Sequence, residues 1–381
     1  MASVKAKQQP TLDATKQSIS DVKVGSVPLP VYLCLSALIL AAGLLQQLPV
    51  NMLGGFAVIL TIGWLLGTIG ASIPGLKNFG GPAILSLLVP SILVFFNLIN
   101  PNVLEATNVL MKQANFLYFY IACLVSGSIL GMNRKMLIQG LFRMIIPMLL
   151  GMICAMAVGT LVGVLLGLDW QHTLFYIVTP VLAGGIKVSD KEDLSDILED
   201  KSGPLDVKMM GAGVLTACTL FISGHLMQHL TGFPGPVLMI VIAALMKYVN
   251  VIPQETQNGA KQLYKFISGN FTFPLMAGLG LLYIPLKDVV ATLSLPYFIV
   301  VISVVFTVVS VGFFVSRFLN MHPVEAAIIS SCQSGMGGTG DVAILSTANR
   351  MNLMPFAQVA TRLGGAITVI IMTAILRMIF K

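Results

Sequence analysis

The chain has 381 residues, of which 56% are hydrophobic and only 10% are charged, whereas a soluble domain carries about 25% charged residues. A water-soluble fold of this length has no core large enough for so much apolar surface, so the composition indicates an integral membrane protein. The net charge of +7 does not predict nucleic-acid binding. The lysines and arginines lie at the ends of apolar stretches, as charges that anchor membrane spans do.

The chain begins with a polar segment, residues 1–30, which has no apolar run with a cleavage site and is predicted to be a disordered cytoplasmic tail. Apolar stretches long enough to approach the roughly 20 residues of a membrane span follow. They lie near 31–50, 54–73, 82–100, 115–132, 140–168 and 172–186, then near 209–230, 236–252, 266–284 and 296–319, before a Gly-rich segment 324–346 and a final stretch 355–380.

The longest charged interval, 187–208, divides the spans into a first hydrophobic half (31–186) and a second half (209–381). We interpret it as a cytoplasmic connector. Two such halves are the outline of a transporter built from inverted structural repeats. Lysine and arginine clusters fall on one side when the N terminus is placed in the cytoplasm and the C terminus outside.

Cysteines and histidines do not indicate a metal or redox centre. The cysteines, which lie inside apolar stretches with no paired spacing, are interpreted as packing residues. The histidines lie near the ends of predicted spans and are given no metal or proton-relay role. These residues are Cys34, Cys123, Cys154, Cys218 and Cys332, and His172, His225, His229 and His322.

The chemistry is predicted to lie in Ser330–Arg362, which has too many small and polar residues to face lipid. Irregular backbone at membrane depth survives only when it is buried in protein or lines an aqueous cavity. The glycine run of residues 335–340 allows a tight turn, and Asp341 follows where a new helix is expected to begin. The exposed N–H groups of a helix start bind carboxylates. We therefore expect 324–346 to be a re-entrant hairpin.

Arg362 lies within the otherwise apolar final segment. A charged side chain inside a span is costly, and a substrate carboxylate gripped by the guanidinium would compensate that cost. The alternatives are an arginine that reaches the interface near the end of the span, or one paired with Asp341. We favour contact with the substrate.

The segment SCQSGMGGTGDVAILSTANRMNLMPFAQVATRLGG resembles the C-terminal signature of the bacterial 2-hydroxycarboxylate transporter family, and the earlier run LGGFAVILTIGWLLGTIG supports the resemblance. It implies a homodimer of 11-span protomers with the N terminus inside and the C terminus outside. It also implies two re-entrant GGxG segments, one in each inverted repeat, and a transport domain that moves as an elevator against a dimerisation scaffold.

Site residues follow from the same resemblance. It places Arg362 and Thr339 on the substrate, and Gly337, Gly338, Gly340, Ser334, Gly184 and Gly185 are further candidates for substrate binding. Candidate cation ligands are Gly335, Asp341, Ser331 and Gln333. No metal is expected beyond a possible Na⁺.

Two departures from the family pattern stand out. The sodium–citrate symporters have an arginine where this chain has Met336, and the loss of a cationic contact favours a dicarboxylate over a tricarboxylate. After Gly184, Gly185 and Ile186 the chain passes directly to Lys187 and the charged interval. A hairpin arm and one span of the family pattern are missing there, which puts the substrate roles of Gly184 and Gly185 in doubt.

The sequence thus predicts an all-α polytopic secondary transporter of the bacterial inner membrane. It is expected to import a 2-hydroxy-dicarboxylate, most readily malate, by symport with Na⁺ or H⁺. Citrate symport, exchange of citrate or malate for a product, and an anion channel are the alternatives. An enzyme and an organic cofactor are not expected, because Asp341 has no evident partner Asp or His at membrane depth. The expected partners are a small carboxylate, membrane lipid and a second copy of the chain.

Overall fold

The protein is represented by a computed structural model that describes residues 23–74, 81–131, 134–182, 207–232, 235–284, 286–287, 294–319, 321–334, 337–361, 364 and 367–368. Almost all of the described chain is helical. Apart from turns between the helices, it contains one antiparallel pair of short strands, β1 (Lys23–Val24) and β2 (Val27–Pro28), in which Lys23 lies opposite Pro28. The predicted all-α class is confirmed.

The first half contains α1 (Leu29–Leu44), α2 (Met52–Ser72), α3 (Gly81–Phe95), α4 (Pro101–Asn108), the π-helical turn η3 (Val109–Gln113), α5 (Phe116–Gly131) and α6 (Arg134–Leu165). A broken segment follows, made of α7 (Trp170–His172), the π-helical turn η4 (Thr173–Val178) and α8 (Thr179–Leu182). The second half contains α9 (Val207–Thr231), α10 (Gly235–Val249), α11 (Gln254–Leu282), α13 (Leu295–Phe318), α14 (Pro323–Gln333), α15 (Gly337–Ala348) and η5 (Met351–Leu353), followed by helical residues 354–361.

Within the described ranges, four helices are long and apolar enough to cross a membrane: α2, α9, α13 and the Arg143–Leu165 part of α6. The helical residues Pro101–Gln113 and α5 together pass the same test but meet at 45°. The bend lies at Asn115, whose φ of 49° is in the left-handed region that asparagine tolerates better than most residues. Several elements of span length make this a multi-pass membrane protein.

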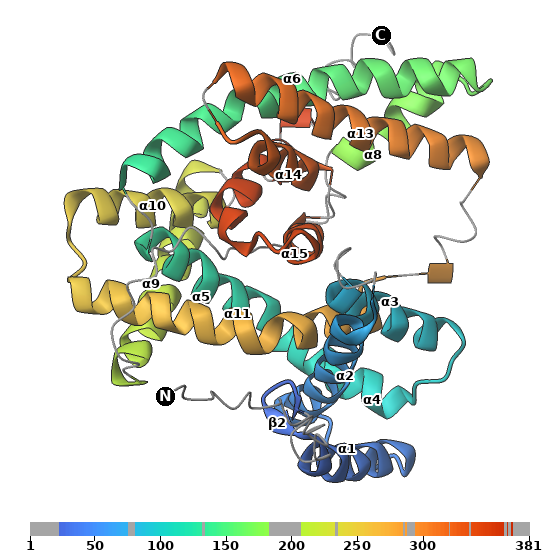
Figure 1. Cartoon of the computed structure of the whole chain (residues 1–381), viewed down its shortest axis with the longest axis vertical. Helices are drawn as coiled ribbons and strands as arrows, with labels where there is room; N and C mark the ends of the chain where they lie inside the picture. Colours follow the sequence, from blue (N-terminus) through green and yellow to red (C-terminus); the bar gives the residue numbers. More distant parts are fainter. Residues whose placement is uncertain are drawn as a thin grey trace, which may run out of the picture.

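The helices form two layers with the C-terminal hairpin between them (Figure 1). In one layer α6 packs along α13, and a separate apolar cluster that includes Met152, Val178 and Val304 joins them to η4. In the other layer α11 packs against α2, α3, α5 and α9. The helices α14 and α15 bridge the layers, because α14 contacts α13 and α6 while α15 contacts α3 and α11.

The crossing of α2 and α11 shows how close these helices come. Pro274 has no N–H to donate, so the carbonyl of Asn270, four residues earlier, loses its helical partner. Trp64 of α2 replaces that donor, with its indole nitrogen 2.9 Å from the Asn270 oxygen. Gly63 makes the approach possible, since a Cβ there would lie 2.4 Å from the Pro274 Cα.

The strand pair docks on the same crossing. Gly25, at a φ of 60°, lies against the Trp64 ring, and the Ser26 hydroxyl is 2.9 Å from the Asn270 side-chain oxygen. Residues 23–28 are therefore packed against α2 and α11, and α1 begins at Leu29. The described chain starts inside the segment 1–30 that was predicted to be a tail, and residues 1–22 lie outside the described part.

A buried lysine joins three helices at the far end of the same layer. Lys247 of α10 is only 9% exposed. Its ammonium donates to the carbonyl of Leu130 in the last turn of α5 and, at 2.7 Å, to Gln257 Oε1 of α11. A cation at the C-terminal end of a helix also complements the helix dipole.

Candidate functional site

The Gly-rich segment forms a pair of short helices. Pro323 stands in the first turn of α14, where its missing N–H costs nothing. The helix ends at Gln333, and Ser334 closes it, with its hydroxyl 2.7 Å from the Ser331 carbonyl oxygen. The helices α14 and α15 have 11 and 12 residues, or roughly 17 Å each, about half of the 30 Å hydrocarbon core. Neither can cross a membrane alone.

The helix after the glycine run begins earlier than expected. A turn was predicted through residues 335–340 with a helix starting at Asp341, but α15 already begins at Gly337. Glycine disfavours helix by only about 1 kcal/mol, and the packing of α15 on α14, α3 and α11 outweighs that preference. Gly337, Gly338, Thr339 and Gly340 thus form the first turn of α15. The first N–H groups of a helix have no intrahelical partner, so this turn can still receive an anion.

The carboxylate of Asp341 connects α15 with the final helix. Asp341 is fully buried, and it accepts a hydrogen bond from Gln358 Nε2 at 2.8 Å and one from Thr361 Oγ1 at 2.7 Å. Gln358 and Thr361 are three residues apart, so they share one helix face. A buried carboxylate is costly unless hydrogen bonds and a compensating positive charge accompany it.

Oxygen atoms converge around the Thr361 hydroxyl. Besides Asp341, it lies 3.0 Å from the carbonyl oxygen of Cys332 in α14 and 2.9 Å from that of Ala357. A hydroxyl has one proton and can donate only once at a time. Three acceptors therefore surround one donor at the point where α14, α15 and the last helix meet, an arrangement suited to a small cation.

Two buried amides near this junction have polar atoms without partners among the described residues. Gln333 is fully buried with neither Nε2 nor Oε1 hydrogen-bonded, and Gln358 Oε1 is also unbonded. Gln333 lies against the last helix, since a Cβ at Gly364 would be 2.9 Å from its Nε2. Buried polar groups are nearly always satisfied, so these atoms indicate a ligand.

The remaining predicted residues divide into two groups. Ser331 and Ser334 are partly exposed on α14 and its cap, and Ser331 Oγ lies 2.6 Å from the Ile328 carbonyl oxygen. Gly340 is also partly exposed. Gly184, Gly185, Gly335 and Arg362, together with Met336, lie outside the described residues.

Sequence reasoning did not select Thr361 or the Cys332 carbonyl as site groups, and it counted Gln358 among the polar residues of the segment without giving it a ligand role. The spacing of Gln358 and Thr361 on one helix face, just before Arg362, was the available signal. Their hydrogen bonds to Asp341 depend on how the hairpin docks, which the spacing alone does not reveal.

A multi-pass helical bundle that holds a buried carboxylate and amide atoms without hydrogen bonds beside a pair of short helices has the architecture of a secondary transporter. The chain belongs to the 2-hydroxycarboxylate transporter family, whose model matches residues 24–189 and 186–374. The family consists of transporters rather than enzymes, in agreement with the prediction.

Named relatives cover nearly the whole chain. A Na(+)-malate symporter of Bacillus subtilis is 47% identical, with 95% of this chain and 94% of the relative aligned. A citrate/malate-proton symporter of the same organism is 36% identical over 92% of this chain and 91% of the relative. A citrate/sodium symporter of Salmonella typhimurium is 24% identical over 95% and 97%.

The alignments also locate a difference in length. The alignment with the Na(+)-malate symporter runs over 421 positions, whereas this chain has 381 residues, so at least 40 positions (421 less 381) have no counterpart here. The two ranges matched by the family model meet at residues 186–189. The boundary between the two matched ranges lies next to Ile186, after which the sequence predicts a shortening.

Proposed function

We propose that this protein imports malate by symport with a cation, Na⁺ in the first instance. The observation that carries the proposal is the buried Asp341 carboxylate, bonded to Gln358 and Thr361 at the meeting point of three helices. The relative of 47% identity is named a Na(+)-malate symporter. A bound cation cancels substrate charge, which lowers the cost of moving a dicarboxylate through a region of low dielectric constant.

The cation site would use oxygen ligands from α14, α15 and the last helix. Asp341 supplies the charge, and the Thr361 hydroxyl and the Cys332 carbonyl supply neutral oxygens. Gln333, Ser331 and Gly335 remain candidates on the α14 side. Carboxylate, carbonyl and hydroxyl oxygens are the ligands that hard cations prefer. In a proton-coupled mechanism, a proton bound to Asp341 would neutralise the carboxylate in place of Na⁺.

The substrate would bind at the start of α15. The N–H groups of Gly337, Gly338 and Gly340 and the hydroxyl of Thr339 would receive one carboxylate or the 2-hydroxyl group, and Arg362 the other carboxylate. Ser334, at the end of α14, borders the same turn. Gly184 and Gly185 would complete the site from the first half, and Met336 in place of an arginine favours a dicarboxylate.

The arrangement of helices supports inverted repeats and a re-entrant hairpin. The first half orders its elements as α2, α3, α5, α6 and a broken segment, and the second half as α9, α10, α11, α13 and α14. Contacts pair accordingly: α2 packs on α11 while α9 packs on α5, and the corresponding helices α6 and α13 pack together. We extend the proposal to a homodimer with an elevator motion in the bacterial inner membrane, with the N terminus in the cytoplasm and the C terminus outside.

The decisive experiment is uptake of labelled L-malate by proteoliposomes that contain the 381-residue chain. An inward Na⁺ gradient is expected to drive accumulation, whereas a K⁺ gradient is not. If a proton gradient alone drives accumulation, the coupling ion is H⁺ and not Na⁺. Absence of both uptake and counterflow would overturn the proposal, and single-channel currents independent of substrate on the opposite side would favour an anion channel.

Citrate symport is the second candidate, because the relative of 36% identity is named for citrate as well as malate. Competition of unlabelled citrate with labelled malate decides between them. The substitution Met336→Arg is expected to improve citrate transport relative to malate, because it restores the cationic contact of the sodium–citrate symporters. An unchanged ratio would contradict the role given to position 336.

A further inference from the structure

The last two turns of α9 carry a pair of histidines. His225 and His229 are one turn apart, both are exposed, and their ring centroids lie 5.0 Å apart with an interplanar angle of 87°. This pair belongs to the layer of α5, α9 and α10 and is separate from the junction around Asp341. Sequence reasoning gave these histidines no metal role, and the closeness of the two rings is what the structure adds.

The backbone that bears the pair is held firmly against α10. Gly224 allows the crossing, since a Cβ there would lie 2.5 Å from the Gly235 carbonyl oxygen. One turn further, Gln228 Oε1 accepts a hydrogen bond of 3.0 Å from the Gly235 N–H. His225 follows Gly224 directly, and His229 follows Gln228. Because both neighbours are fixed, little backbone ordering remains to oppose binding of a ligand by the two imidazoles.

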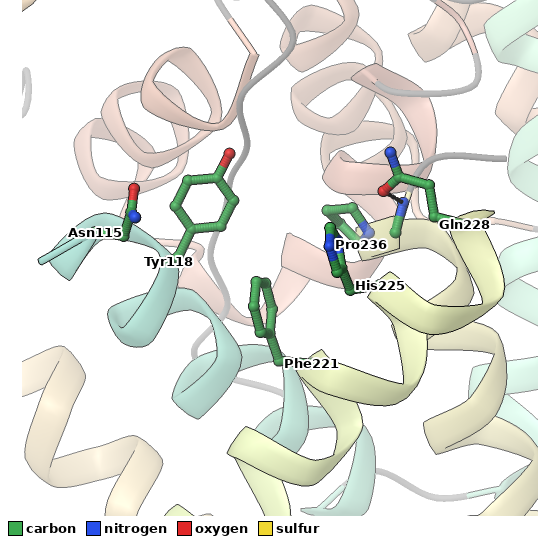
Figure 2. A pocket seen from close by; sticks show the side chains of 7 residues that line it. Asn115, Tyr118, Phe221, His225, Gln228 and Pro236 are labelled. Carbon is green, nitrogen blue, oxygen red and sulfur yellow. Dashed lines mark hydrogen bonds between the residues drawn. The ribbon is translucent and has the colours of Figure 1, made fainter. Parts of the chain in front are cut away.

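A cavity of about 370 Å³ opens beside His225 (Figure 2). Phe221 and Tyr118, whose rings are 5.8 Å apart, form one wall, and His225 faces the space from α9. Its lining is completed by Asn115, Gln228, Gly235 and Pro236. No lysine, arginine or carboxylate is among these lining residues, and the volume is enough for several water molecules at about 30 Å³ each.

The ring separation falls within the range open to two imidazoles on one tetrahedral ion, and it is also that of an ordinary edge-to-face ring contact. Zinc–nitrogen bonds are about 2.0–2.1 Å long, which places each ring centre about 3.2 Å from the metal and the two centres about 5.2 Å apart at the tetrahedral angle. The observed value is 5.0 Å. Two histidines at positions i and i+4 of a helix are also the pair that zinc metalloproteases use to hold their metal.

We propose that His225 and His229 bind a divalent transition-metal ion of the Zn²⁺, Cu²⁺ and Ni²⁺ group. Imidazole suits these ions, whereas Mg²⁺ and Ca²⁺ prefer oxygen ligands. The protein supplies two ligands, and water fills the remaining positions; His225 lines the cavity, whereas His229 is not among its lining residues. An ion bound there links two consecutive turns of α9 beside its crossing with α10, far along the helix from its start at Val207.

The test is a titration of the purified full chain, prepared without a polyhistidine tag, with ZnCl₂ in competition with a chromophoric chelator. One Zn²⁺ per chain is expected, and His225→Ala and His229→Ala should each weaken binding at least 10-fold. His172→Ala and His322→Ala are the matched controls, because those side chains lie outside α9. Both control variants should bind Zn²⁺ as the parent does.

A spectroscopic measurement makes the result independent of the folded yield of the variants. Electron paramagnetic resonance of bound Cu²⁺ should show two nitrogen ligands in the parent chain and one in each single variant. Retention of two nitrogen ligands in both variants, or Zn²⁺ binding unchanged by His225→Ala, would overturn the proposal. Displacement of Zn²⁺ by equimolar Mg²⁺ would also overturn it, since an imidazole site discriminates against Mg²⁺.

Discussion

The replacement Asp341→Asn tests the centre of the proposed cation site. It keeps the size of the side chain and removes its charge. Gln358 Nε2 now donates to one carboxylate oxygen at 2.8 Å and Thr361 Oγ1 to the other at 2.7 Å. An asparagine can keep both contacts, because its Oδ1 accepts from Gln358 while its Nδ2 donates to the Thr361 hydroxyl, which then donates to the Cys332 carbonyl. The variant therefore loses the charge for a cation and little else.

The size of the effect follows from the burial of the carboxylate. Two unit charges 4 Å apart attract by about 4 kcal/mol at the effective dielectric constant of 20 that suits protein sites. Desolvation of the ion offsets part of this attraction, so we expect a net loss of about 2–4 kcal/mol. At 1.4 kcal/mol for each factor of ten, Na⁺ affinity should fall by about 30- to 700-fold.

The assay is the Na⁺ concentration that gives half-maximal malate counterflow in proteoliposomes, together with the rise in melting temperature caused by Na⁺ in detergent. Asp169→Asn is the matched control, because Asp169 caps α7 through the His172 N–H and lies outside the hairpin. A normal Na⁺ dependence in Asp341→Asn would refute the assignment of the cation to this carboxylate.

Three further changes test other parts of the structure. Thr361→Val removes the hydroxyl between Asp341 and Cys332, so Na⁺ affinity should fall about 10-fold, given about 1–1.5 kcal/mol for a hydrogen bond. Serine should restore it, and a failure of that rescue would count against a ligand role. Gly63→Ala places a Cβ 2.4 Å from Pro274 and should cost about 1–3 kcal/mol of stability. Gly211→Ala, with nothing within 4 Å of its Cβ, should melt no lower than the parent. Lys247→Met should cost about 1.5–3 kcal/mol, and a melting temperature equal to that of the parent would contradict its role in joining three helices.

The elements with strong apolar runs could be predicted from the sequence. The span expected at 115–132 is α5, Phe116–Gly131, and the span expected at 296–319 is α13, Leu295–Phe318. The helix at Pro101–Gln113 was not predicted. Asn102, Glu105 and Lys112 make this segment too polar to be predicted as a membrane span. It is helical because it continues into α5 across the bend at Asn115 and packs against α2.

The break in the C-terminal hairpin could also be predicted, but its extent could not. A glycine-rich run predicts where the backbone can turn. It does not predict which of its glycines become helical, because that depends on tertiary packing. The docking of residues 23–28 was missed for a related reason. A short polar segment carries little pattern of its own, and its position depends on Trp64 and Asn270 of helices far away in the chain.

The shortening expected after Ile186 would affect the two proposed sites differently. The described groups of the cation cluster all come from residues 332–361, so a missing segment near residue 186 removes none of them. The proposed substrate site, in contrast, draws Gly184 and Gly185 from the neighbourhood of that segment. Na⁺ binding by the isolated chain is therefore expected to persist even where malate uptake is slow. Na⁺-induced stabilisation without uptake or counterflow would overturn the proposed malate transport and leave the cation site standing, whereas absence of Na⁺-induced stabilisation would show that residues 332–361 do not hold the cation.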